Sequence, residues 1–155
     1  MYRQKIVAGN WKMNGSVAKN VQLINALTQA NSDNVQIIVA PPAIYVSSVK
    51  AQLMGSSIAL AGQNVAAESQ SGAYTGEISA QMLADFGVAY AIVGHSERRQ
   101  YYGETDNSVA KKCLRLREQG LKPIICVGES LAERESGQAE AVVSRQLKAV
   151  IDFCG

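Results

Sequence analysis

The chain has 155 residues, of which 47% are hydrophobic and 18% charged, and its formal net charge is +2 at pH 7. This length suffices for one domain with a sizeable core, and we expect residues 1–155 to form one domain without a second. So small a net charge disfavours nucleic acid as a partner, and no apolar run is long enough to predict a membrane span. The first residues lack the apolar core of a signal peptide.

The cysteines, Cys113, Cys126 and Cys154, occur without a Cys-x-x-Cys motif and without a histidine cluster. This pattern is typical of a protein in the reducing cytoplasm, and it predicts no metal site. The basic residues within 111–117 recur at helical spacing, which predicts a solvated helix face rather than a nucleic-acid interface.

Short apolar runs alternate with longer helical patterns along the chain, which predicts an α/β fold with a parallel sheet. The predicted strands are nearly continuous apolar runs, as expected for strands covered on both faces, at residues 6–8, 35–40, 58–61, 89–93 and 123–127. The predicted helices are residues 17–30, 44–53, 79–86, 108–119 and 139–153. Gly87 and Gly120 follow the third and fourth helices, where a left-handed residue often ends a helix. Five βα units result.

Two of the predicted strands end in side chains that carry chemistry. Asn10 and Lys12 follow the first strand, and His95, the single histidine, follows Gly94 at the end of the fourth. A predicted helical turn over residues 96–102 comes next. In parallel α/β folds, ligands and catalytic groups collect at the carboxyl ends of the strands. Lys12 offers a cation for a phosphate or an oxyanion, and Asn10 offers both a donor and an acceptor.

These segments closely resemble those of the triosephosphate isomerase family. The resemblance is carried by five peptides in the family's order and spacing, which lie at residues 8–15 (AGNWKMNG), 63–65 (QNV), 71–79 (SGAYTGEIS), 94–97 (GHSE) and 125–129 (ICVGE). It extends from about Lys5 to the end of the chain. It implies a (β/α)8 TIM barrel, of which this chain supplies strands 1–5 and helices 1–5, because such a barrel has eight units and typically about 250 residues.

The resemblance implies a cofactor-independent isomerase of glycolysis and gluconeogenesis, which interconverts dihydroxyacetone phosphate and D-glyceraldehyde 3-phosphate through an enediolate. His95 would be the electrophile that hydrogen-bonds the substrate oxygens and moves protons between them. This family is itself the established example of a histidine kept neutral by a helix N-terminus. Lys12 would bind the phosphate and stabilise the enediolate, and Asn10 would orient the substrate. Glu97 is expected close to Lys12, where it either holds the ammonium or joins in proton movement.

In the family, the catalytic base is a glutamate at the end of the sixth strand, beside the closing loop, and most of the phosphate site follows later strands. The 155 residues contain none of these, so we expect the isolated chain to be inactive. Because an open parallel sheet leaves two unpaired edges, we also expect the chain alone to associate, to be loosely packed or not to fold. Glu129 ends the fifth strand, but it matches a structural loop of the family and is not assigned as the base.

Residues 64–77 form a connection longer than most, which indicates a function. The resemblance implies that its tip inserts into a second subunit, so that Tyr74 and Thr75 lie at a homodimer interface; a flexible surface loop is the simpler interpretation.

Two alternatives to an isomerase remain open. One is a catalytically inactive, truncated or split barrel, and the other is a different barrel enzyme that acts on a sugar phosphate with carboxylates drawn from Glu97, Glu104 and Glu129.

Overall fold

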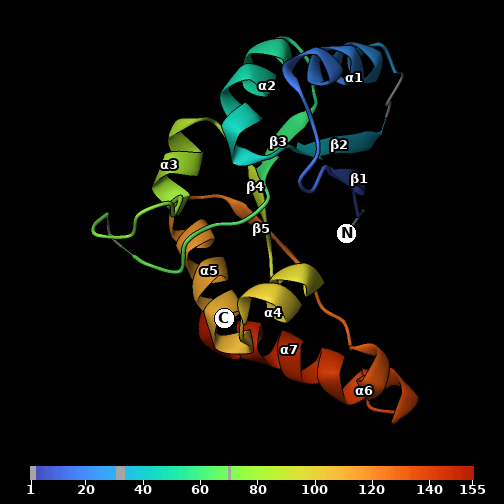
Figure 1. Cartoon of the computed structure of the whole chain (residues 1–155), viewed down its shortest axis with the longest axis vertical. Helices are drawn as coiled ribbons and strands as arrows, with labels where there is room; N and C mark the ends of the chain where they lie inside the picture. Colours follow the sequence, from blue (N-terminus) through green and yellow to red (C-terminus); the bar gives the residue numbers. More distant parts are fainter. Residues whose placement is uncertain (1–2, 31–33, 70) are drawn as a thin grey trace.

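The computed structural model describes residues 3–30, 34–69 and 71–155, which form five strands and seven α-helices. The strands are β1 (Lys5–Asn10), β2 (Val35–Ala40), β3 (Ala59–Gly62), β4 (Tyr90–Val93) and β5 (Lys122–Ile125). The helices are α1 (Val17–Gln29), α2 (Val46–Gln52), α3 (Ala80–Asp85), α4 (Ser96–Tyr102), α5 (Asp106–Glu118), α6 (Leu131–Glu135) and α7 (Ala139–Cys154). Figure 1 shows the strands in the middle of the molecule, with α1 and α2 at one end and α6 and α7 at the other.

The sheet contains the five strands in sequence order, β1-β2-β3-β4-β5, and every pair is parallel. At their carboxyl ends Asn10 of β1 lies opposite Ala40 of β2, and Val93 of β4 lies opposite Ile125 of β5. The sheet curls, with helices between successive strands. This is part of a TIM barrel containing strands 1–5, as the sequence predicted.

The core has two parts, because successive side chains of a strand point to opposite faces of the sheet. Val39, Leu60 and Val93 belong to the large cluster that the strands form with the helices. Ile38, Ala61 and Ile92, one position away in each strand, form a smaller cluster on the other face. The central strands are therefore covered on both faces, which explains why β2, β3 and β4 read as continuous apolar runs.

The first strand does not fit that prediction. Ile6 is 53% exposed and Val7 is 61% exposed, although both belong to a predicted covered strand. Within the described residues β1 pairs with β2 alone, so it is an edge of the sheet. An edge strand has a neighbour on one side only, and its apolar side chains have correspondingly fewer contacts.

The predicted helices are all found, with ends that differ by at most two residues. Gly87 and Gly120 have φ angles of 65° and 72°, which confirms the left-handed residues expected after α3 and α5. The short helix α6 was not predicted. Its signal is nevertheless in the sequence, since Ser130 and Glu133 form a reciprocal capping box at its start.

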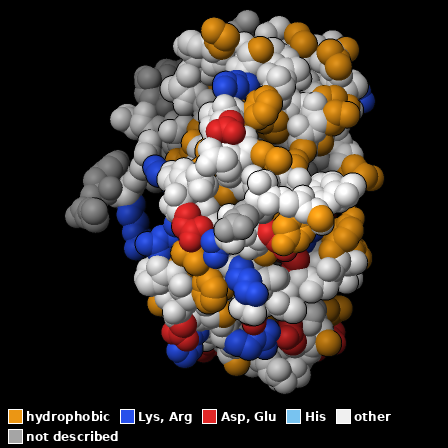
Figure 2. Space-filling view, turned by 90° about the vertical axis from the view of Figure 1, so that its left-hand side faces the viewer, with side chains coloured by type: hydrophobic (Ala, Val, Ile, Leu, Met, Phe, Trp, Pro, Cys, Tyr) orange, Lys and Arg blue, Asp and Glu red, His pale blue; other side chains and the backbone are white. Residues whose placement is uncertain are grey.

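In the part of the chain that the structure describes, no helix is both long and apolar enough to cross a membrane. Figure 2 shows one face of the molecule, with apolar side chains spread over its upper part and more of the charged ones in its lower half. The segment between β3 and α3, which contains Tyr74, projects away from the sheet in Figure 1.

Gly94 is the residue on which the turn between β4 and α4 depends. Its φ angle is 70°, a conformation that is unfavourable for residues with a Cβ atom. A Cβ atom here would also lie about 3.0 Å from the Val109 side chain and 3.1 Å from the carbonyl oxygen of Cys126. Both the backbone angle and the packing therefore require glycine.

We predict that Gly94→Ala lowers the free energy of unfolding by about 1–3 kcal/mol more than Gly103→Ala does. Gly103 has a φ angle of 66°, but a Cβ atom there would meet nothing within 4 Å. The two substitutions therefore share the backbone strain, and only Gly94→Ala adds crowding. Urea unfolding of both variants measures the difference, and equal losses would show that packing around Gly94 is unimportant.

Candidate active site

The curled sheet brings the predicted site residues together at the carboxyl ends of its strands. Asn10 is the last residue of β1, Lys12 lies two positions beyond it, and His95 is the N-cap residue of α4. Together with Glu97 in the first turn of α4, these residues line a cleft of about 380 Å³. Side chains from β1 and α4, 85 positions apart in the sequence, thus share one site.

Lys12 and Glu97 form an ion pair across this cleft. Lys12 Nζ donates a hydrogen bond to Glu97 Oε1 at 2.6 Å, so the proximity expected from the resemblance is present. This hydrogen bond holds the pKa of Glu97 below its ordinary value. The two side chains are 52% and 42% exposed. Water screens so exposed a pair, so it contributes little to stability, and its main effect is to orient a cation in the cleft.

The backbone of Lys12 is held in an unusual conformation. Its φ angle is 52°, which is uncommon for a residue other than glycine. The Asn10 side chain accepts a hydrogen bond from the Lys12 N–H at 2.9 Å, and Gln63 Nε2 donates to the Lys12 carbonyl at 2.9 Å. Gln63 Nε2 also donates to the carbonyl of Ala40 at 2.8 Å. Gln63, to which sequence reasoning gave no individual role, therefore ties Lys12 to the end of β2.

The His95 imidazole caps the helix that follows it. Its Nδ1 atom accepts a hydrogen bond from the backbone N–H of Glu97 at 3.3 Å. Serine, threonine, aspartate and asparagine are the usual residues at this position, and a histidine can replace them only through an unprotonated ring nitrogen. The geometry therefore favours a neutral imidazole that carries its proton on Nε2. Within the described residues no hydrogen bond occupies Nε2.

A competing contact would favour the charged imidazole, because Glu97 Oε2 lies 3.5 Å from His95 Nδ1. This distance is longer than that of the backbone bond, and the carboxylate is already paired with Lys12 at 2.6 Å. The positive end of α4 also disfavours a cation at its N-terminus. We therefore assign His95 as neutral.

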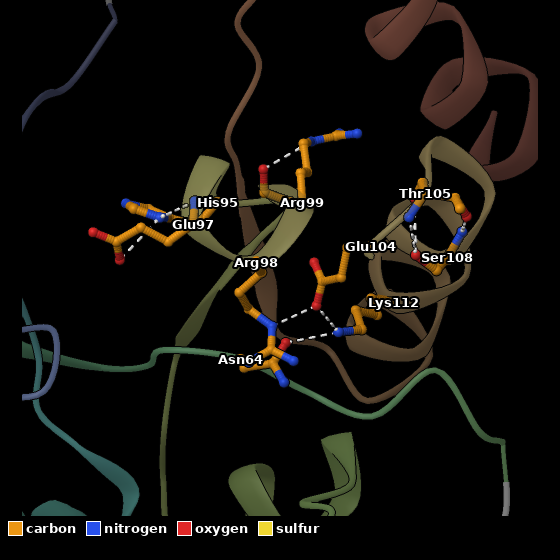
Figure 3. A network of polar contacts seen from close by, with 10 residues as sticks. Asn64, His95, Glu97, Arg98, Arg99, Glu104, Thr105, Ser108 and Lys112 are labelled. Carbon is orange, nitrogen blue, oxygen red and sulfur yellow. Dashed lines mark hydrogen bonds and ion pairs between the residues drawn. The ribbon is translucent and has the colours of Figure 1, made fainter. Parts of the chain in front are cut away.

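A buried polar network joins α4, which carries His95 at its start, to α5 and to Asn64. Glu104 accepts hydrogen bonds from Arg98 of α4 and from Lys112 of α5, and Lys112 donates to Asn64 Oδ1 at 2.8 Å (Figure 3). The Glu104 and Lys112 side chains are only 6% and 7% exposed. Burial alone would raise the pKa of Glu104, but the hydrogen bonds from Lys112 and Arg98 outweigh it, so the pKa is lowered.

This network corrects one part of the sequence analysis. Lys112 belongs to the basic run that was predicted to be a solvated helix face, but it is buried and paired. Helical spacing alone does not show that the buried carboxylate of Glu104 lies beside Lys112, because this contact depends on the conformation of the chain between α4 and α5.

Comparison with known proteins identifies the family. The family model described as triosephosphate isomerase matches residues 5–155. The chain belongs to the triosephosphate isomerase family. It is 54% identical to "Triosephosphate isomerase" of Paracidovorax citrulli over an alignment of 159 positions, which covers all of this chain and 63% of that protein. It is also 54% identical to the protein of the same name from Delftia acidovorans, over 99% of this chain and 62% of that protein.

The chain thus spans about three fifths of the length of these relatives. The match runs through every segment that lines the cleft, from β1 to α4, since it begins at Lys5. Family membership and the geometry of the cleft therefore concern the same residues.

The structure disfavours the alternative barrel enzyme with a pair of catalytic carboxylates. Glu97 is bound to Lys12, Glu104 to Arg98 and Lys112, and Glu129 to Arg134 at 2.7 Å. Glu97 faces the cleft described above, whereas Glu104 and Glu129 border a different cavity. Each carboxylate is already paired with at least one cation, and the three do not face one cavity.

The cysteines are free thiols, and burial raises the pKa of both Cys113, to about 12, and Cys126. Such thiols are poor nucleophiles, which agrees with a packing role for Cys126. Among residues 3–30, 34–69 and 71–155, no three histidine, cysteine, aspartate or glutamate side chains come together in a way that could hold a metal ion.

We predict that the imidazole nitrogen-15 shifts of the single histidine show an unprotonated Nδ1 and a protonated Nε2. The reason is that Nδ1 must accept the Glu97 N–H bond, and protonation would remove a helix cap. Nitrogen-15 shifts of the imidazole distinguish the two neutral tautomers from the cation. A predominantly charged ring at pH 7 would contradict the assignment.

We predict that Lys112→Met lowers the free energy of unfolding by about 3 kcal/mol or more at pH 7, because it leaves a buried carboxylate short of a partner. The pKa of Glu104 is lowered in the folded protein, so the stability that Lys112 contributes is present above about pH 4.5 and is lost as the pH falls through the folded-state pKa. The difference between the variant and the parent protein should therefore shrink in acid.

Lys111→Met is the matched control, since Lys111 is the exposed neighbour of Lys112 on the same helix. Urea unfolding at pH 7 and at pH 3.5 measures both effects. A loss for Lys112→Met that equals the loss for Lys111→Met would show that the buried pair does not stabilise the fold.

Proposed function

We propose that the protein catalyses the triosephosphate isomerase reaction, the interconversion of dihydroxyacetone phosphate and D-glyceraldehyde 3-phosphate. The observation that carries this proposal is the meeting of Lys12 and His95 in one cleft of a chain that belongs to this family. Proton transfer between adjacent carbons needs donors for the two enediolate oxygens and a cation for the accumulating charge. His95 and Lys12 have the chemistry for these two tasks.

His95 would donate from Nε2 to the substrate carbonyl oxygen. A neutral imidazole suits this role, because its acidity is closer to that of an enediol than the acidity of an imidazolium is. The same nitrogen can then exchange protons between the two substrate oxygens. The Nδ1 bond to the Glu97 N–H favours this tautomer and holds the ring in one orientation.

Lys12 would attract the phosphate and stabilise the enediolate. Its ammonium carries three N–H donors, and Glu97 takes one of them, so two are left for a substrate. Asn10, at the end of β1, would orient the substrate. Glu97 would hold the ammonium in place, which the 2.6 Å ion pair favours over a direct part in proton movement.

The reaction also requires a base to take the proton from carbon and a lid to exclude water. The family's pattern assigns these parts, and most of the phosphate contacts, to strands and loops beyond the fifth βα unit. We propose that they lie outside these 155 residues, and that the 155-residue chain alone does not turn over substrate.

We further propose that the active protein is a homodimer of the cytoplasm, in which the segment after β3 contacts the second subunit. Tyr74 is 50% exposed and Thr75 is exposed, so both are accessible to a partner. Gln70 of this segment lies outside the described residues. Sedimentation of the active protein tests the proposal, and a monomer at working concentration would contradict it.

The deciding experiment joins this chain to the part of the Paracidovorax citrulli relative that it does not cover, and it measures glyceraldehyde 3-phosphate isomerisation. We predict turnover, and we predict that His95→Asn and Lys12→Met each lower kcat/KM by at least about 100-fold, because each removes a group that stabilises the transition state. Lys19→Met, at an exposed lysine of α1 away from the cleft, should leave kcat/KM unchanged.

The 155-residue chain is assayed in parallel with its own His95→Asn variant as a control for contaminating host enzyme. Turnover that depends on His95 in this chain would show that the base is supplied within or between the 155-residue chains. A joined protein that folds but is inactive would contradict the proposed roles of Lys12 and His95.

A further inference from the structure

Arg99 of α4 holds the peptide groups on both sides of His95. Its backbone N–H donates a hydrogen bond to the His95 carbonyl at 3.1 Å, and its side-chain Nε donates to the Gly94 carbonyl at 3.0 Å. The Gly94 carbonyl belongs to the same peptide plane as the His95 N–H. The backbone N–H of Arg98 also donates to the His95 carbonyl, at 2.8 Å, so the contact that distinguishes Arg99 is its side-chain bond to the Gly94 carbonyl before the imidazole (Figure 3).

The orientation of the Arg99 guanidinium is itself set by a second pair. Arg99 Nη1 donates to Asp106 Oδ1 at 2.5 Å, and Arg145 Nε of α7 donates to Asp106 Oδ2 at 3.0 Å. The Arg99 and Asp106 side chains are only 17% and 22% exposed. Burial would raise the pKa of Asp106, but the hydrogen bonds from Arg99 and Arg145 lower it, so the carboxylate is charged near neutral pH.

We propose that Arg99 is a positioning residue for His95, and that Asp106 and Arg145 act through it. The proposal rests on the proposed function, in which the His95 imidazole meets the substrate. Rotation of the peptide between Gly94 and His95 would redirect the imidazole, and Arg99 Nε binds the carbonyl that would have to move. A misplacement of about 1 Å at a reacting group can cost about 100-fold in rate, so restraint at this peptide has a large effect.

Arg98 provides a matched comparison. It precedes Arg99 on the same helix and its side chain also binds a carboxylate, but that carboxylate is Glu104 and not Asp106. Figure 3 shows the two arginine side chains leaving α4 in different directions. The Arg98 side chain therefore supports α4 without donating to a carbonyl beside His95. Lysine can replace neither guanidinium fully, because it has no second nitrogen at a fixed distance and angle from the first.

The test uses the joined protein and the imidazole nitrogen-15 signals of His95 at pH 7, which are identified as the signals that its His95→Asn variant lacks. Arg99→Lys should move these signals away from the parent values and broaden them, because the Gly94 carbonyl loses its donor. Arg98→Lys should leave them close to the parent values. Asp106→Asn, which keeps an acceptor but removes the charge, should move them in the same direction as Arg99→Lys. Equal effects of the two lysine substitutions would overturn the proposal.

Arg145→Gln covers the case in which Arg99→Lys does not fold. The Arg145 side chain is 59% exposed, so its replacement should preserve the fold. We expect a smaller change of the His95 signals in the same direction, and unchanged signals in a folded Arg145→Gln variant would then overturn the proposal.

A kinetic measurement separates positioning from substrate binding. In the joined protein, Arg99→Lys should lower kcat by about 10- to 100-fold while KM stays within about twofold. The NMR measurement needs no turnover, so an inactive joined protein would contradict the proposed function without removing the test of Arg99.

Discussion

The parallel pairing of five strands in sequence order is the constraint on which the site depends. It places every strand's carboxyl end at the same edge, so that the residues after β1, β3 and β4 face one another. Pairing alone would leave β1 and β4 separated by the two strands between them. The curl of the sheet closes this gap, as the 2.6 Å contact between Lys12 and Glu97 shows.

The end of β3 connects the two sides of this edge. Gln63 donates to the carbonyls of Lys12 and Ala40, and its neighbour Asn64 accepts from Lys112 of α5. These two successive residues thus bind different parts of the fold: Gln63 binds the segments that end β1 and β2, and Asn64 binds α5. Loss of a partner from a buried network of this kind is costly, because the interior screens charge poorly.

The helix α4 is held by its charged residues in three directions. Glu97 binds Lys12 beyond β1, Arg98 binds Glu104, and Arg99 binds Asp106 at the start of α5. The first of these pairs is exposed and stabilises the fold little, whereas Glu104 is almost fully buried. The two more buried pairs therefore place the helix, and the exposed pair arranges charge in the cleft. His95 lies at the N-terminus of this helix, so its position depends on both kinds of ion pair.

The order of the strands, every helix except α6, two left-handed glycines and four residues of the cleft could be predicted from the sequence, because they depend on local pattern and on peptides typical of one family. Asn10, Lys12, His95 and Glu97 were found in this way. Contacts that join distant segments could not be predicted. Four features depend instead on how the sheet curls and which helices pack together. They are the burial of Lys112 against Glu104, the hydrogen bond from Gln63 to Lys12, the series of contacts from Arg145 through Asp106 and Arg99 to Gly94, and the exposure of β1. Local spacing does not encode these distances, so only the tertiary structure decided them.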